Sequence, residues 1–192
     1  VSGKIILLTT PLRHSFMVEE HYRLCLIAKK IEERGLAGKN YSEYIRNVDN
    51  AKLINEHQKK YFWKLNSFTS AKKLATEDFA KELKEMFERK ENLSKFILSY
   101  KTLRSKIKEK KKIIGKIKNQ KLVDLLLISD SLFDIHDRRK EYITRVLDRL
   151  DFILVEIAMR FKIPPEDLRY ISPSEFHQLP DLRKELRRRR EE

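Results

Sequence analysis

The stretch from Asp137 to Lys162 decides the fold of this chain, and it reads DRRKEYITRVLDRLDFILVEIAMRFK. Its apolar residues recur three and four positions apart, which places them on one face of an α-helix. Charged residues occupy the other face, and Pro164 and Pro165 end the pattern, because the residue before a proline disfavours the helical region. The stretch therefore predicts an amphipathic helix. The residues of its apolar face are Ile143, Val146, Leu147, Leu150, Leu154, Ile157, Ala158 and Phe161.

The same helical spacing extends outward over most of the 192 residues. Four glycines and five prolines are too few for the turns that a sheet protein requires. We therefore predict an all-α fold, an antiparallel bundle of about six or seven helices with little or no sheet, in a single helical domain over residues 1–192. Within it we expect a connector or short strand in 1–14, the bundle in 15–162, and a turn, a short helix and a charged tail in 163–192.

Capping residues mark the expected helix boundaries. A first helix runs from about Ser15 to Arg34, where Gly35 is placed to stop it. The sequence from Asn40 to Glu43 fits a capping box, and the helix that it opens is expected to reach about Phe68. Further helices are expected over 76–89, 92–115, 119–134 and 137–162, and another start signal lies in 172–175, where Ser, Pro and Glu take their preferred positions.

The composition excludes several classes of protein. The single cysteine, Cys25, excludes an internal disulfide framework and a cysteine-rich zinc site, and it fits the reducing cytoplasm, where we expect the protein. Apolar runs such as Leu125–Ile128 are far short of the roughly 20 residues of a membrane span. Because the chain begins with Val1, we expect it to be a piece of a longer product. Few glutamines among many lysines and glutamates are typical of heat-tolerant proteins.

The net charge of +14 is concentrated in two segments. Residues 101–121 carry ten Lys or Arg and one acid, and residues 183–192 carry six Lys or Arg and three Glu. Such segments attract polyanions without specifying one, so they indicate either a nucleic-acid or acidic-protein surface, or a solvated helix face with a charged tail. The residues of the candidate polyanion patch are Lys106, Lys108, Lys110, Lys111, Lys112 and Lys116.

Motifs of catalysis and metal binding are missing from the sequence. It contains no phosphate loop, no GxGxxG, no HExxH and no nucleophile elbow, so we predict no catalytic residue, no metal and no cofactor, and leave open whether the chain belongs to an enzyme. Three acids, Asp130, Asp134 and Asp137, could share one helix face and hold Mg²⁺. The basic residues 138–140 follow at once, so intrahelical ion pairs are the favoured interpretation.

An aromatic cluster, Tyr61-Phe62-Trp63, lies between lysines. This mixture suits either the stacking of nucleobases over a basic groove or an anchor in the hydrophobic core. The core interpretation is favoured, because the only Trp of a chain is usually packed.

Two stretches suggest a family. Residues 137–143 read DRRKEYI, and residues 157–176 read IAMRFKIPPEDLRYISPSEF. Together they resemble the helical region of phosphoenolpyruvate-utilising phosphotransferases, such as the phosphoenolpyruvate synthase-like and rifampicin phosphotransferase-like proteins. The resemblance covers about 40 residues, with a looser match at 61–66, and Lys162 stands where the family often has Gly.

The resemblance implies a non-catalytic domain that positions an acceptor substrate or links the ATP-grasp and swivelling phosphohistidine domains, in cis or in trans. Both catalytic domains are missing from this sequence, and none of its five histidines has the family's phosphohistidine context. Arginine suits phosphate and aromatic rings suit an apolar acceptor, so six residues are the candidate substrate-binding set. They are Tyr61, Trp63, Arg138, Arg139, Tyr142 and Arg145. The alternative is a basic helical module that binds nucleic acid or another protein.

Overall fold

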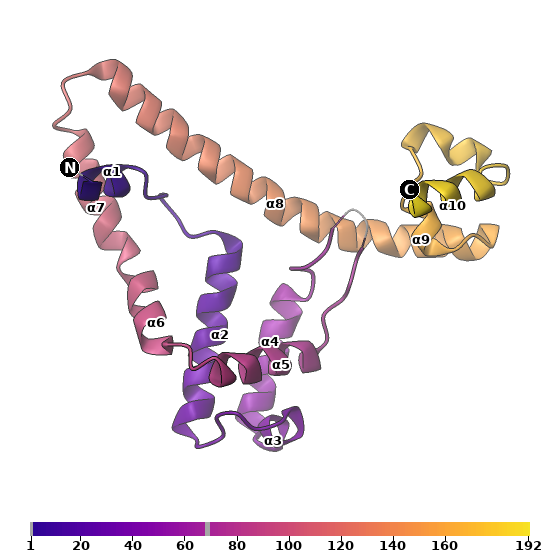
Figure 1. Cartoon of the computed structure of the whole chain (residues 1–192), viewed down its shortest axis with the longest axis horizontal. Helices are drawn as coiled ribbons and strands as arrows, with labels where there is room; N and C mark the ends of the chain where they lie inside the picture. The colour runs from indigo at the N-terminus through magenta and orange to yellow at the C-terminus, as the bar shows by residue number, and fades with distance from the viewer. Residues whose placement is uncertain (1, 68–69) are drawn as a thin grey trace. The chain divides into compact units, whose positions relative to one another are not determined.

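The protein is all-α, as the sequence predicts. The computed structural model describes residues 2–67 and 70–192, and across them the chain forms α-helices and one short 3-10 helix, with no strand. The helices are α1 (Ser2–Leu8), α2 (Phe16–Glu33), α3 (Tyr41–Arg46), α4 (Val48–Tyr61), α5 (Thr76–Glu88), α6 (Leu93–Lys101), α7 (Leu103–Ile114), α8 (Gln120–Phe161), α9 (Pro165–Leu168), η1 (Pro173–Gln178) and α10 (Arg183–Glu191) (Figure 1).

The chain divides into two compact units, where the sequence predicts one helical domain over 1–192. Unit 1 comprises Val1–Tyr61 and Ala75–Glu141, and unit 2 comprises Phe62–Leu74 and Tyr142–Glu192. Each unit is therefore formed from two separate segments of the sequence. The long helix α8 supplies residues to both.

Unit 1 is built around α2, which packs against α4, α5 and α6 (Figure 1). The Ser15 hydroxyl caps α2 by accepting a hydrogen bond from the Val18 N–H, and Gly35 follows its end with φ of +70°, a conformation that favours glycine. Residues of α2 and α5 that share one helix face form the core. They are Leu24, Cys25, Ala28, Ile31, Phe79, Ala80 and Leu83.

Several helix boundaries differ from those expected. Residues Ser2–Leu8 form a helix, α1, which packs beside α7, whereas the sequence predicts a connector or short strand in 1–14. The helix opened by the Asn40 capping box breaks at Asn47, and α4 ends at Tyr61; the end predicted at Phe68 lies outside the described residues. The two helices expected over 119–134 and 137–162 are one continuous helix, α8.

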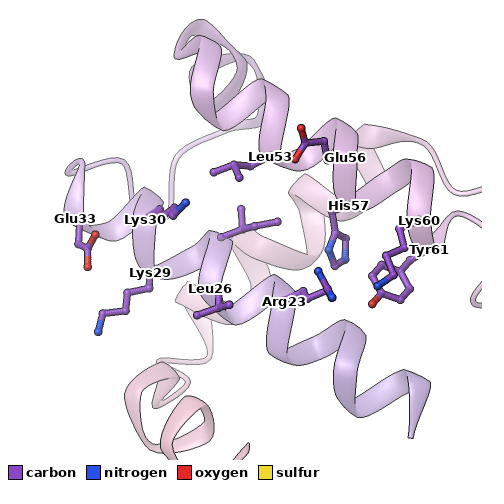
Figure 2. A pocket seen from close by; sticks show the side chains of 11 residues that line it. Arg23, Leu26, Lys29, Lys30, Glu33, Leu53, Glu56, His57, Lys60 and Tyr61 are labelled. Carbon is purple, nitrogen blue, oxygen red and sulfur yellow. The ribbon is translucent and has the colours of Figure 1, made fainter. Parts of the chain in front are cut away.

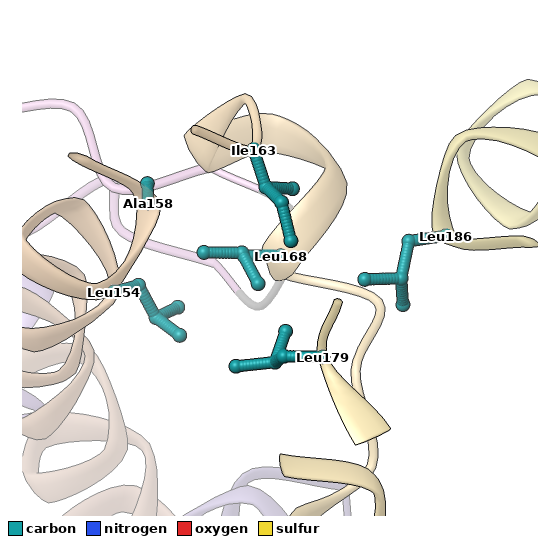
Figure 3. Packing of buried hydrophobic residues seen from close by; sticks show 6 residues of the cluster. All are labelled: Leu154, Ala158, Ile163, Leu168, Leu179 and Leu186. Carbon is teal, nitrogen blue, oxygen red and sulfur yellow. The ribbon is translucent and has the colours of Figure 1, made fainter. Parts of the chain in front are cut away.

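Unit 2 has a small apolar core of its own (Figure 3). Apolar side chains from α8, α9, α10 and the turns between them pack against one another. Trp63 is also buried in this unit, and the Arg145 guanidinium carbon lies 4.7 Å from the centre of its ring. The members of the core are Leu154, Ala158, Ile163, Leu168, Leu179 and Leu186.

An ion pair between Arg189 and Glu175 stabilises the C-terminal part of unit 2. The Arg189 guanidinium donates to both oxygens of Glu175, at 2.8 and 2.9 Å, and the Ser172 backbone N–H donates to the same carboxylate at 2.9 Å. These bonds, that of Arg189 above all, lower the pKa of Glu175 from 4.5 to about 2. The capping box predicted at Ser172 is thus formed.

We expect this pair to make the stability of unit 2 depend on acidic pH. Because the folded-state pKa of Glu175 lies below its ordinary value, the stabilisation is complete above about pH 4.5 and is lost as the pH falls towards 2. Titration of the Glu175 carboxyl carbon by NMR should show a midpoint near 2. Glu175→Gln should flatten the pH dependence of unfolding in this window, and a Glu175 midpoint near its ordinary value would contradict the assignment.

Candidate polyanion-binding surface

The basic face of α7 is the most distinct feature of the chemistry of unit 1. Leu103, Ile107 and Ile114 recur along one side of α7, and five of its other positions are lysines. One acid, Glu109, is exposed on the same helix, and no ion pair between it and these lysines is found among the described residues. The exposed members of the predicted patch are Lys106, Lys108, Lys111, Lys112 and Lys116.

Lys110 does not belong to the exposed patch, which corrects the sequence-based prediction. It lies three residues after Ile107 and four before Ile114, so its side chain points to the apolar side of α7 and is fully buried. Its ammonium donates to Asp130 Oδ1 at 2.5 Å and to the carbonyl of Thr10 at 2.8 Å. The spacing from Ile107 and Ile114 could have revealed this inward position in the sequence.

The three acids of α8 that the sequence analysis singled out, Asp130, Asp134 and Asp137, form ion pairs with basic residues of other segments of unit 1. Asp130 pairs with Lys110, and Arg13 pairs with Asp134 and, at 3.7 Å, with Asp137. The predicted intrahelical ion pair is present only in part, between Asp134 and Arg138 at 2.9 Å. Among the described residues, no group of His, Cys, Asp and Glu is placed to hold a metal ion.

The second basic segment is neutralised by its own neighbours. Arg187 pairs with Glu191, Arg188 with Glu185, Arg189 with Glu175 and Glu185, and Arg190 with Asp167, at distances of 2.8 to 3.1 Å. Arg189 and Arg190 therefore hold α10 to residues outside it, Arg187 and Arg188 are paired within α10 itself, and Arg183 takes part in no ion pair among the described residues. By contrast, within residues 2–67 and 70–192 the exposed α7 lysines take part in no described ion pair.

A pocket of about 470 Å³ lies between α2 and α4 of unit 1 (Figure 2). Its apolar wall consists of Leu26, Ile27 and Leu53, and its rim carries charges of both signs. His57 lies in its lining, and its Nε2 is 2.8 Å from Glu20 Oε1 in a buried pair. Tyr61 lines the same end, where its hydroxyl donates to Glu19 at 3.4 Å.

The pKa values of two groups at this end of the pocket, Tyr61 and Glu19, are shifted in opposite directions. Burial, and then the charge of Glu19, raise the pKa of Tyr61, so its phenol stays protonated at neutral pH. Burial opposes ionisation of Glu19, but the hydrogen bonds and charges of Lys60 and Arg23 outweigh it and lower the pKa of Glu19. The carboxylate is thus held ionised between two cations, 3.1 Å from each.

The structure divides the six residues predicted to bind substrate between the two units. Tyr61, Arg138 and Arg139 belong to unit 1, where Tyr61 is buried in α4 and the two arginines are exposed on α8. Trp63, Tyr142 and Arg145 belong to unit 2, where Arg145 stacks on the buried ring of Trp63 and Tyr142 is exposed. Tyr61 and Trp63 are packed, as the core interpretation of their cluster predicts.

Comparison of the chain with protein-family models, with curated proteins and with solved structures gives no match. The relation to phosphoenolpyruvate-utilising phosphotransferases therefore stays a prediction, and so does the role of the six residues in substrate binding. In the part of the chain that the structure describes, no helix combines the length and apolarity needed to cross a bilayer.

Proposed function

We propose that this protein is a helical module that binds the phosphate backbone of nucleic acid through α7. The observation that carries the proposal is the contrast between the two basic segments. The four consecutive arginines 187–190 of α10 are paired with acids. By contrast, the lysines of α7 and the one that follows it point into solvent with no acidic partner among the described residues: Lys106, Lys108, Lys111, Lys112 and Lys116. Charges that are not neutralised within the fold are available to a polyanion.

The geometry of α7 supports contact with a backbone rather than recognition of bases. The buried Lys110–Asp130 pair holds one side of α7 against the protein. Lys108 and Lys112 lie on the opposite side of the helix, and Lys106 and Lys111 lie on its flanks. Lysine binds phosphate as a point charge, and no aromatic side chain lies among these residues to stack on a base. We therefore expect affinity with little sequence specificity, and contacts that release counterions.

The test is the salt dependence of binding to a labelled 20-base-pair DNA duplex, measured by fluorescence anisotropy. The intact chain should bind at low salt, and the logarithm of its association constant should fall by about 0.9 per neutralised phosphate for each unit of log salt concentration. Replacing Lys106, Lys108, Lys111 and Lys112 together by Gln should weaken binding at least tenfold. The slope should shrink by up to about 3.6.

A matched control separates the α7 surface from net charge. Lys29, Lys52, Lys59 and Lys81 are exposed lysines of unit 1 that lie outside α7, and their replacement by Gln removes the same four charges. In this control, the loss of affinity and the decrease in slope should each be less than about half of those seen for the α7 variant. Equal losses in the two variants, or no binding by the intact chain at low salt, would reject the proposal.

A further inference from the structure

The first half of α8 is docked on unit 1 by its polar side. Asp130, Asp134 and Asp137 share one face of the helix, and they meet Lys110 and Arg13 from the rest of the unit. An ordinary surface helix buries its apolar stripe and turns its charges to solvent. In this part of α8 the charges are turned inwards, so the apolar stripe faces out.

Four large apolar side chains form that outward stripe. Leu125, Ile128, Leu132 and Ile135 are 63, 55, 61 and 61 % exposed. They follow one another at three, four and three residues, the spacing by which a helix packs along a second helix. Exposed apolar stripes of this extent are typical of interaction sites rather than of free surface.

Within residues 121–139, a basic residue lies in line with the stripe on each side of it. Exposed apolar side chains continue along α8 past Arg139, at Val146 and Ile153, and the exposed Asp124 lies three residues after Lys121. Lys121 lies four residues before Leu125 and Arg139 four residues after Ile135, and both are exposed. The two are eighteen residues apart, five whole turns, so they lie in line with the stripe about 27 Å from each other. A partner that covers residues 121–139 must therefore meet a positive charge at each end.

We propose that residues 121–139 of α8 bind an amphipathic helix of a partner protein, whose apolar seam carries a carboxylate at each end. Such a helix places its apolar residues against Leu125, Ile128, Leu132 and Ile135, and its two acids beside Lys121 and Arg139. This is the helix-in-groove mode of recognition, with the end charges setting the register.

A second copy of the chain fits this stripe poorly. A symmetric dimer pairs the same patch of both copies. A parallel pair places Lys121 against Lys121 and Arg139 against Arg139, and an antiparallel pair places each against the other, so both orientations oppose like charges. A lipid surface also fits less well, because interfacial helices carry Lys and Arg on the polar face, where this segment carries Asp130, Asp134 and Asp137.

The test uses two designed peptides and the full chain. Both peptides carry four leucines at the seam spacing; the acidic peptide has Glu at the two ends of the seam, and the basic peptide has Lys there. Fluorescence anisotropy should show the acidic peptide binding at least tenfold more tightly than the basic one. Leu132→Gln should weaken the acidic peptide at least tenfold, whereas Leu127→Gln, exposed on α8 outside the stripe, should change it less than twofold.

Reversing the charge of Arg139 tests whether the peptide binds along this stripe or at another basic surface of the protein. With Arg139→Glu, the preference for the acidic peptide should fall at least tenfold, while the α7 variant with four Gln should keep it. No preference between the peptides, or a preference unaffected by Arg139→Glu, would overturn the proposal. So would two other results: a dimer in light scattering that Leu132→Gln dissociates, or binding to phosphatidylserine vesicles, but not to the acidic peptide, that Leu132→Gln abolishes.

Discussion

Lys110→Ala should destabilise unit 1 by about 3–5 kcal/mol, because it leaves the carboxylate of Asp130 buried without a counter-charge. The Lys110 side chain is fully buried, that of Asp130 is nearly so, and their charged atoms are 2.5 Å apart. The substitution also removes the donor to the Thr10 carbonyl, which joins the segment after α1 to α7. Urea unfolding followed by circular dichroism at 222 nm measures the loss.

Two further variants separate the buried charge from the loss of side-chain volume. Lys110→Met combined with Asp130→Leu removes both charges, and its stability should equal or exceed that of the natural chain, since apolar replacement of a buried pair is commonly neutral or stabilising. Lys108→Ala, an exposed neighbour on α7, should change the free energy of unfolding by less than about 0.5 kcal/mol. A loss of under about 1 kcal/mol for Lys110→Ala would mean that Asp130 is hydrated in solution.

Local signals in the sequence predicted the helix class and several of its boundaries. Ser15 and Gly35 bound α2 as expected, and the capping boxes at Asn40 and Ser172 are formed. These signals are reliable because a capping side chain satisfies backbone donors within the same few residues. The all-α fold follows from the same local rules.

The helix breaks at Asn47 and Thr102 were not predicted from the sequence. The break at Asn47 has a local cause. At Asn47 the backbone is extended, and its side-chain oxygen accepts from the Asn50 N–H and opens α4, a capping signal that the sequence does contain. At Thr102, the residue between α6 and α7, the hydroxyl donates to the Ser99 carbonyl at 2.8 Å. Between 134 and 137 nothing interrupts the helix, so the two predicted helices join as α8.

The candidate site was harder to predict than the fold, because its lysines differ in tertiary context. Composition shows the basic segment, and spacing separates Lys110 from its neighbours. Which acids neutralise which bases depends on contacts across more than a hundred residues, as between Arg13 and Asp134. The outward stripe of α8 lies partly in the helix predicted over 119–134, and the apolar face of a helix predicted from a single sequence is assigned to the core by default. Only the position of Lys110 and Arg13 shows that this face is turned away from unit 1.

Leu168→Ala should destabilise unit 2 by about 2–5 kcal/mol, the cost of the lost transfer free energy and of the cavity that remains. Leu168 is fully buried at the centre of a core of six residues, where Ile163, Leu179 and Leu186 approach it from separate elements (Figure 3). So small a core has few other contacts to compensate. The sole Trp of the chain, Trp63, belongs to unit 2, so its fluorescence during urea unfolding reports on this unit.

The matched controls are Met159→Ala and Leu168→Met. Met159 is 65 % exposed on α8, so its truncation should cost less than about 0.5 kcal/mol, and Leu168→Met keeps the volume and should cost less than about 1.5 kcal/mol. Because α2 belongs to unit 1 and packs there against α4, α5 and α6, amide exchange in α2 should be unchanged by Leu168→Ala while exchange in α9 accelerates. Equal losses for Leu168→Ala and Met159→Ala would contradict the core position of Leu168, and equal acceleration in α2 and α9 would show that the two units unfold as one.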